Sequence, residues 1–90
     1  MSKQEVRAAV ARKLNVGFRD GPHATGWYIV RGRKVARVSI PWGAGDLAPW
    51  IAKEIRSKLY LSPKEFARLV GCPMGGAEYY EVLRRKGLID

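Results

Sequence analysis

Residues 25–41, TGWYIVRGRKVARVSIP, decide the fold. Residues 25–30 are rich in β-branched and aromatic side chains, and residues 35–40 alternate between two faces, so both runs predict strands. The short glycine-containing connection between them predicts an antiparallel hairpin, and Pro41 ends it because proline cannot donate to a ladder. The sequence therefore predicts a small antiparallel sheet of two strands, with residues 18–20 as a candidate third strand at its edge.

Helical patterns lie on both sides of this hairpin. Residues 3–14 are expected to form an amphipathic helix opened by a capping box at Ser2. After the hairpin, Asp46 is expected to cap a second helix, Ser62 a third, and residues 76–86 form a fourth. The order α-β-β-(β)-α-α-α predicts an α+β domain with its helices packed on one face of the sheet.

The size and charge of the chain narrow the class of partner. Ninety residues make a single domain over residues 1–90, and the net charge is +9. Residues 1–40 hold a net +7 and residues 41–90 only +2. So large an excess predicts a polyanionic partner, and nucleic acid is favoured over an anionic membrane because no long basic amphipathic helix is present.

The cysteine and histidine counts limit the chemistry. One cysteine and one histidine cannot form an internal disulfide or a zinc cage, so no metal or other cofactor is expected. Cys72 is interpreted as a small apolar filler. The polar start and the lack of a long apolar run predict a cytoplasmic protein with no membrane partner.

His23 is the one candidate for proton transfer near neutral pH. Cleavage of RNA needs a base for the 2′-hydroxyl group and cations for the charge that develops on the phosphate. An imidazole ringed by arginines would suit that task, and the candidate arginines are Arg19, Arg31, Arg33 and Arg37. The alternative is that His23 is an ordinary turn residue bonded to local backbone.

A basic hairpin is the second candidate. Arg31, Arg33, Lys34 and Arg37 cluster beside Trp27 and Tyr28. Guanidinium groups hold phosphates, and an exposed aromatic ring stacks on an unpaired base, so this cluster predicts RNA binding. Alternatively, the charges only protect a sheet edge from aggregation and the aromatic rings belong to the core. The alternation does not decide which ring faces outward; Trp50 is interpreted as a packing residue, and Trp42 stays open.

The C-terminal helices support a different hypothesis. The third and fourth predicted helices have the outline of a helix-turn-helix, which would make the chain a non-catalytic DNA-binding regulator. However, residues 75–78 at the start of the presumed recognition helix are Gly, Gly, Ala and Glu, which cannot read base edges as Arg, Asn or Gln do. A third hypothesis is a protein-interaction module that docks an acidic partner.

The chain resembles the HicA family of mRNA-interferase toxins over about residues 3–70. The resemblance rests on the order and spacing of several segments: a first helix ending at Gly17-Phe18, the turn Gly21-Pro22-His23 and the aromatic strand after it, Gly32-Arg33-Lys34 leading to Val38-Ser39-Ile40-Pro41, Gly45-Asp46-Leu47 opening a helix, and Leu61-Ser62-Pro63-Lys64-Glu65-Phe66 starting another. Residues 71–90 extend beyond the common short form as a helical extension.

The resemblance implies a fold similar to double-stranded-RNA-binding domains and the activity of an endoribonuclease. It implies that His23 is the catalytic histidine, that the sheet and the basic residues hold RNA, and that a HicB-like antitoxin masks the site. These implications are expectations for the structure and for experiment.

Overall fold

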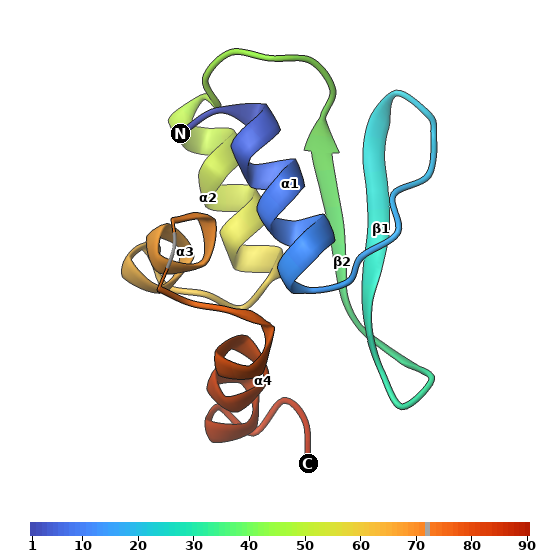
Figure 1. Ribbon diagram of the computed structural model, residues 1–90, viewed down its shortest axis with the longest axis vertical. Coiled ribbons are helices and arrows are strands. Elements are labelled where there is room, and N and C mark those ends of the chain that lie inside the picture. The colour runs from blue at the N-terminus through green and yellow to red at the C-terminus, as the bar shows by residue number, and fades with distance from the viewer. Residues whose placement is uncertain (72) are drawn as a thin grey trace.

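The structure is a computed structural model that describes residues 1–71 and 73–90, so the interpretation of Cys72 lies outside the described residues. Six elements follow one another along the chain: α1 (Lys3–Lys13), β1 (His23–Val30), β2 (Arg33–Pro41), α2 (Pro49–Lys58), α3 (Pro63–Val70) and α4 (Gly76–Arg85). The strands form a two-stranded antiparallel sheet, and the helices gather on one side of it (Figure 1). The predicted α+β class is confirmed.

The hairpin is closed by a tight turn and interrupted by one irregularity. Arg31 and Gly32 both have positive φ, 51° and 78°, which is the geometry of a two-residue type I′ turn. The register shifts between Tyr28 and Ile29, so that Ile29 pairs with Lys34 while Tyr28 pairs with Ala36. Such a shift marks a β-bulge, which leaves one residue of β2 unpaired.

The candidate third strand over residues 18–20 is not formed. Residues 18–20 contribute one isolated bridge, in which the amide of Arg19 donates to the carbonyl of Thr25 at 2.8 Å. The chain passes along the edge of β1 there without continuing as a ladder. Its path brings Arg19 to the sheet, which matters for the site described below.

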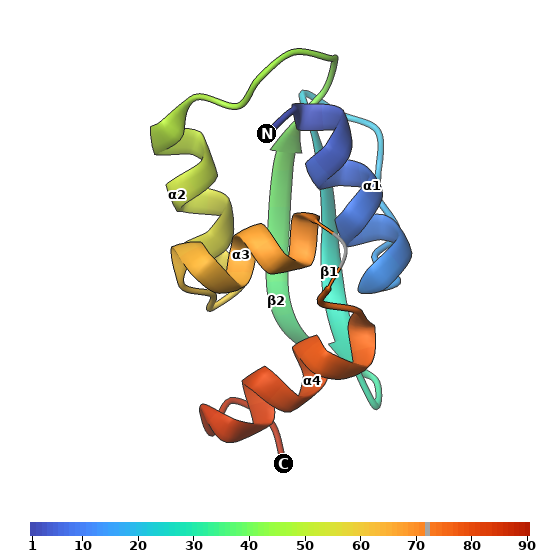
Figure 2. The same ribbon diagram turned by 60° about the vertical axis from the view of Figure 1, so that its left-hand side comes forward.

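Strand alternation gives the sheet an inner and an outer face. Ala24, Gly26 and Tyr28 of β1 and Ala36, Val38 and Ile40 of β2 are all buried. These residues face the helices. Apolar residues of α1 and α3 complete the core, among them Val6, Val10, Phe66 and Leu69. Figure 2 shows α3 crossing in front of the two strands on this inner side.

Two of the three predicted helix caps form. Ser2 and Ser62 each accept from the backbone amide three residues later, and both capping boxes are complete. Asp46 does not cap α2, which begins at Pro49 after Ala48 without any side-chain cap. The reason is long-range pairing, since the carbonyl of Gly45 and the amide of Leu47 bond to the chain's first residues.

Helix α4 joins the same hydrophobic core as the rest of the molecule. Tyr79 is fully buried, its hydroxyl donates to the carbonyl of Leu59 at 3.0 Å, and its ring meets that of Tyr28 edge-to-face at 4.9 Å. Val82 and Leu83 are buried beside it. The C-terminal extension thus covers the end of the sheet near the turn. None of the helices in the described ranges is long and apolar enough to cross a membrane.

Candidate nucleic-acid interface

The outer face of the sheet presents polar, cationic and aromatic side chains in two rows. The β1 row consists of His23, Thr25, Trp27 and Ile29, and the β2 row of Lys34, Arg37 and Ser39. A period of two along each strand places most of these side chains on one side, and the bulge at Val35 brings Lys34 to the same side, opposite Ile29. We call these seven residues the outer face.

Trp27 lies at the centre of the outer face, between two cations. Its cross-strand partner is Arg37, and the Nζ atom of Lys34 lies 5.0 Å from the centroid of its ring. The lysine covers part of the indole, which leaves 36% of Trp27 exposed. An aromatic ring flanked by an ammonium and a guanidinium group offers one base-stacking surface and two phosphate contacts.

A cleft of about 370 Å³ opens beside Trp27. It is lined by Gly17, Arg19, Thr25, Gly26, Trp27, Lys34 and Arg37. Gly26 makes this arrangement possible, since a Cβ atom there would lie 2.6 Å from the carbonyl oxygen of Gly17. Glycine therefore allows residues 16–19 to approach β1 closely and to bring Arg19 to the cleft.

His23 is the first residue of β1 and its side chain is exposed at one end of the outer face. The sequence interpretation placed it in a turn, and the structure corrects this: it pairs with Pro41 in the ladder. Given the usual rise per residue in a strand, His23 lies roughly 13 Å from Trp27. Within the residues that the structure describes, no side chain bonds to the imidazole.

Hydrogen bonds from Trp42 and Arg7 stabilise the end of the sheet beside His23. The Nε1 atom of Trp42 donates to the carbonyl of Gly21 at 2.8 Å, two residues before the histidine. Arg7 donates to the carbonyl of Pro41 at 2.8 Å, and its guanidinium group lies 5.5 Å from the centroid of the Trp42 ring. The sequence does not indicate a role for Trp42 or Arg7, because each bonds to a residue far away along the chain.

The predicted arginine cluster divides into two groups. Arg37 and Lys34 belong to the outer face, and Arg19 lines its cleft. Arg31 and Arg33 lie at the turn end of the hairpin, opposite the end that holds His23, and line a separate pocket. The expected ring of four arginines around the imidazole is therefore not what the structure shows.

Two aromatic assignments also change. Tyr28 is only 8% exposed and packs against Tyr79 in the core, so it is not available to stack on a base. Burial raises the pKa of its hydroxyl above the ordinary value. Trp50, interpreted as a packing residue, is 70% exposed on the first turn of α2.

In the part of the chain that the structure describes, neither Lys34 nor Arg37 forms an ion pair with an acidic side chain. The ion pairs within the described ranges join Arg68 to Glu78, Arg84 to Glu81 and Lys86 to Glu65, all in the C-terminal half. The Lys86 ammonium, together with the Ser62 amide, lowers the pKa of Glu65. The positive charge of the sheet is therefore not neutralised internally and can act on a polyanion.

The start of α4 is not placed as a recognition helix requires. A Cβ atom at Gly76 would collide with the carbonyl oxygen of Lys13 at the end of α1. Lys13 in turn donates to the carbonyl of Leu69 at 2.7 Å, and Glu78 is held by Arg68 at 2.8 Å. The first turn of α4 thus packs against α1, whereas a helix-turn-helix presents that turn to the major groove.

Comparison with known proteins does not assign a family. No family model, no curated protein and no solved structure matches the chain. The resemblance to HicA therefore rests on the segments quoted above, and function must be argued from the outer face itself. Among the described residues, no three His, Cys, Asp or Glu side chains are grouped as a metal site would require.

Proposed function

We propose that this protein binds single-stranded RNA on the outer face and cleaves it as a HicA-like endoribonuclease. One observation supports this most directly: His23, Trp27, Lys34 and Arg37 share one face of the sheet, and the helices that the structure describes gather on the other side (Figure 1). The four side chains supply an imidazole, a stacking surface and two cations on a rigid scaffold. The predicted double-stranded-RNA-binding-like fold belongs to the same proposal.

Binding begins at Trp27. An unpaired base stacks on the indole after Lys34 moves from the ring to a neighbouring phosphate, where its charge is better used. Arg37, across the strand from Trp27, and Arg19, in the cleft, hold the phosphates on either side. Since stacking does not distinguish bases strongly, this mode favours unpaired RNA of varied sequence.

Cleavage takes place at His23, on a nucleotide other than the one stacked on Trp27. The imidazole accepts the proton of the 2′-hydroxyl group, the 2′-oxygen bonds to the adjacent phosphorus, and the bond from phosphorus to the 5′-oxygen breaks. Water protonates the leaving 5′-oxygen, and the hydroxide that remains takes the proton from the imidazolium, which restores neutral His23 and leaves a 2′,3′-cyclic phosphate. Arg7, held on the carbonyl of Pro41, is the cation that the structure places at this end of the sheet. A HicB-like antitoxin would inhibit the reaction by covering the outer face.

The decisive test is cleavage of a short unstructured RNA by the wild-type chain and by His23→Ala. Loss of a general base is expected to slow cleavage by about 100-fold or more, while RNA binding measured by fluorescence anisotropy stays the same. DNA of the same sequence should bind and remain intact, because it lacks the 2′-hydroxyl group. Equal cleavage of RNA by both proteins would remove His23 from the mechanism.

A further inference from the structure

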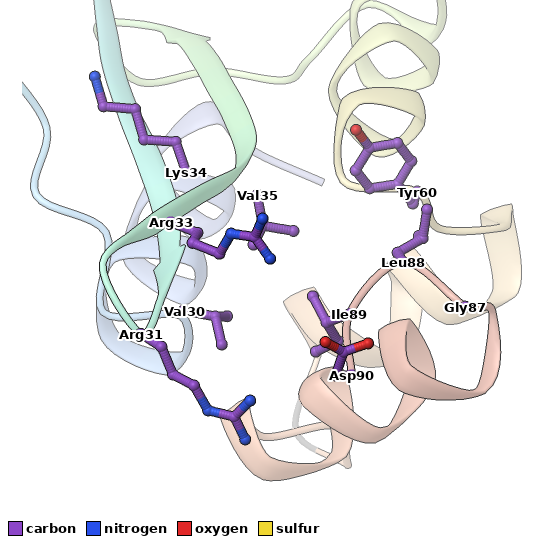
Figure 3. Close-up of a pocket in the computed structure, with 10 residues that line it drawn as sticks. All are labelled: Val30, Arg31, Arg33, Lys34, Val35, Tyr60, Gly87, Leu88, Ile89 and Asp90. Carbon is purple, nitrogen blue, oxygen red and sulfur yellow. The ribbon is translucent and has the colours of Figure 1, made fainter.

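A second pocket lies outside the outer face, between the hairpin turn and the C-terminal segment. It has a volume of about 470 Å³ and is lined by Val30, Arg31, Arg33, Lys34, Val35, Tyr60, Gly87, Leu88, Ile89 and Asp90 (Figure 3). This volume falls within the range of about 300–1,000 Å³ that is usual for small-molecule sites. The function proposed above does not use this pocket.

Two residues of this pocket have an unfavourable backbone conformation. Arg31 and Tyr60 have φ values of 51° and 62°, in the left-handed region where glycine and asparagine are normally found. The third such residue in the described ranges, Asn15, is of a type suited to it. Glycine would relieve the strain at Arg31 and Tyr60 but would remove both side chains from the pocket. The type I′ turn requires this conformation at Arg31, and the end of α2 requires it at Tyr60, so each position keeps a large side chain at a conformational cost.

Cationic groups enter the pocket from the hairpin. Figure 3 shows the guanidinium group of Arg33 projecting into the space, whereas the chain of Lys34 extends away from it, toward Trp27. Arg31 is oriented by its bond to the Tyr80 hydroxyl at 3.3 Å, and that hydroxyl donates to the carbonyl of Asp90 at 3.2 Å. Among the described residues, no carboxylate forms an ion pair with Arg31 or Arg33.

The opposite wall is aromatic and apolar. Tyr60 and Leu88 face the hairpin across the pocket in Figure 3, and both are more than 40% exposed. Asp90 adds a carboxylate to the lining, which can accept hydrogen bonds from hydroxyl or amino groups. The lining of the pocket thus includes two arginines, an aromatic ring and a carboxylate that accepts hydrogen bonds.

We propose that this pocket binds a nucleotide, with its phosphate on Arg31 and Arg33 and its base against Tyr60. Guanidinium groups match the geometry of a phosphate, and an aromatic ring with an apolar neighbour favours a planar base over a plain inorganic anion. The ligand is either a free nucleotide or one nucleotide of a bound RNA chain. Lys34 lines both this pocket and the cleft beside Trp27, but the proposed contacts from Arg31, Arg33 and Tyr60 lie outside the outer face and do not depend on cleavage.

The test is titration of the isotopically labelled full chain with adenosine 5′-monophosphate, adenosine and inorganic phosphate. The monophosphate is expected to shift the amide signals of Arg33 and Tyr60 in NMR spectra, and to bind at least ten-fold more tightly than either fragment. Arg33→Gln should weaken its binding ten-fold or more. The matched control is Arg84→Gln, because Arg84 lies on the surface of α4, outside the pocket lining, and forms an ion pair with Glu81; this variant should bind as the wild type does.

Tyr60→Gly separates a binding role from a structural one. This change removes backbone strain and the ring together, so we expect a higher melting temperature and weaker binding of the monophosphate. The proposal is overturned if Tyr60→Gly binds unchanged, if Arg84→Gln weakens binding as much as Arg33→Gln does, or if inorganic phosphate binds as tightly as the monophosphate.

Competition with a short RNA distinguishes the two sources of the nucleotide. Displacement of the monophosphate by RNA assigns the pocket to a unit of the RNA chain, and simultaneous binding assigns it to a free nucleotide; both results support the site. Trp27→Ala should leave binding of the monophosphate unchanged. Failure of the outer-face proposal would therefore be seen separately from failure of this one.

Discussion

Trp27 and Tyr28 are neighbours in sequence with opposite roles in the structure. Trp27 points outward between Lys34 and Arg37, whereas Tyr28 points inward to Tyr79. The period of two along a strand requires one of the two rings to be buried once the other is exposed. Both side chains are aromatic and could stack on a base. Which of the two can do so therefore depends only on the phase of the alternation in β1.

Trp27→Ala is expected to weaken binding of single-stranded RNA by about 5- to 150-fold, which corresponds to about 1–3 kcal/mol for one stacked base. Its melting temperature should change little, because the ring lies on the surface. Fluorescence anisotropy and thermal unfolding measure the two effects. The control Tyr28→Leu should lower the melting temperature and leave the affinity of the folded protein nearly unchanged. Wild-type affinity in Trp27→Ala would contradict the assignment of this ring.

The phase of β2 could be predicted from the sequence, and that of β1 could not. Residues 36–40 alternate clearly between small or apolar and polar side chains, and this placed Arg37 and Ser39 on one face, as found. In β1, Trp27, Tyr28 and Ile29 follow one another and all have large side chains, so these three positions do not by themselves separate the two faces. The packing of α4 determines the phase of β1, because Tyr79 of α4 packs edge-to-face against the ring of Tyr28.

At the scale of elements, close approach of the segment before β1 shapes the site. Val16 and Gly17 press against Gly26, where an added Cβ atom would lie 2.6 Å from each of them. This approach allows Arg19 to bond to Thr25 and to line the cleft beside Trp27. The absence of a side chain at Gly26 thus determines the position of Arg19 beside the cleft.

Gly26→Ala is expected to destabilise the protein by about 1–3 kcal/mol, because the methyl group forces backbone apart in a packed region. RNA affinity should also fall, since Arg19 moves away from the cleft. Chemical denaturation and anisotropy at a temperature where the variant is folded measure these effects. A matched change, Gly17→Ala, meets no atom within 4 Å and should be tolerated; equal losses in both variants would contradict the close-approach argument.

Helix ends that are defined by contacts between residues close in sequence could be predicted, whereas those defined by distant contacts could not. The capping boxes at Ser2 and Ser62 involve atoms three residues apart, and both could be predicted from the sequence. Asp46 has the right side chain for a cap, yet its segment pairs with the distant N-terminus and α2 begins later. The candidate third strand failed for a similar reason, because residues 18–20 follow the edge of β1 only at Arg19.

For the whole molecule, a tyrosine in the core joins the C-terminal helix to the sheet. Tyr79 contacts Tyr28 and bonds to the carbonyl of Leu59, and burial raises the pKa of its hydroxyl well above the ordinary value of about 10. A group whose pKa is higher in the folded state stabilises the fold fully at lower pH and loses that contribution as the pH rises. Stability should therefore fall as the pH rises above about 10.

Tyr79→Phe is expected to remove most of this alkaline loss, because the ionisable hydroxyl is gone. At pH 7 the variant should be less stable by about 1–3 kcal/mol, since the carbonyl of Leu59 loses its buried donor. Denaturant titrations from pH 7 to 11 measure both effects. Tyr80→Phe, which changes a hydroxyl at the surface, should keep the alkaline loss. The same slope in wild type and Tyr79→Phe would contradict the argument.

The distribution of charge over the whole molecule could be predicted only in part. The excess of basic residues in the first 40 positions is evident from the sequence, and none of those in the hairpin forms an ion pair with an acidic side chain among residues 1–71 and 73–90. Their division into two groups depends on the bulge and on the turn, which reverse the side on which a side chain projects. Residues adjacent in the chain can in this way serve different ligands.

Both ends of the hairpin are restrained, one by its type I′ turn and the other by the bond from Trp42 to Gly21. A two-stranded ribbon would otherwise fray at its open end, where His23 lies. With both ends fixed, the side chains on its surface keep their mutual spacing before any ligand arrives. Less conformational entropy is then lost on association, so a small number of contacts can yield useful affinity.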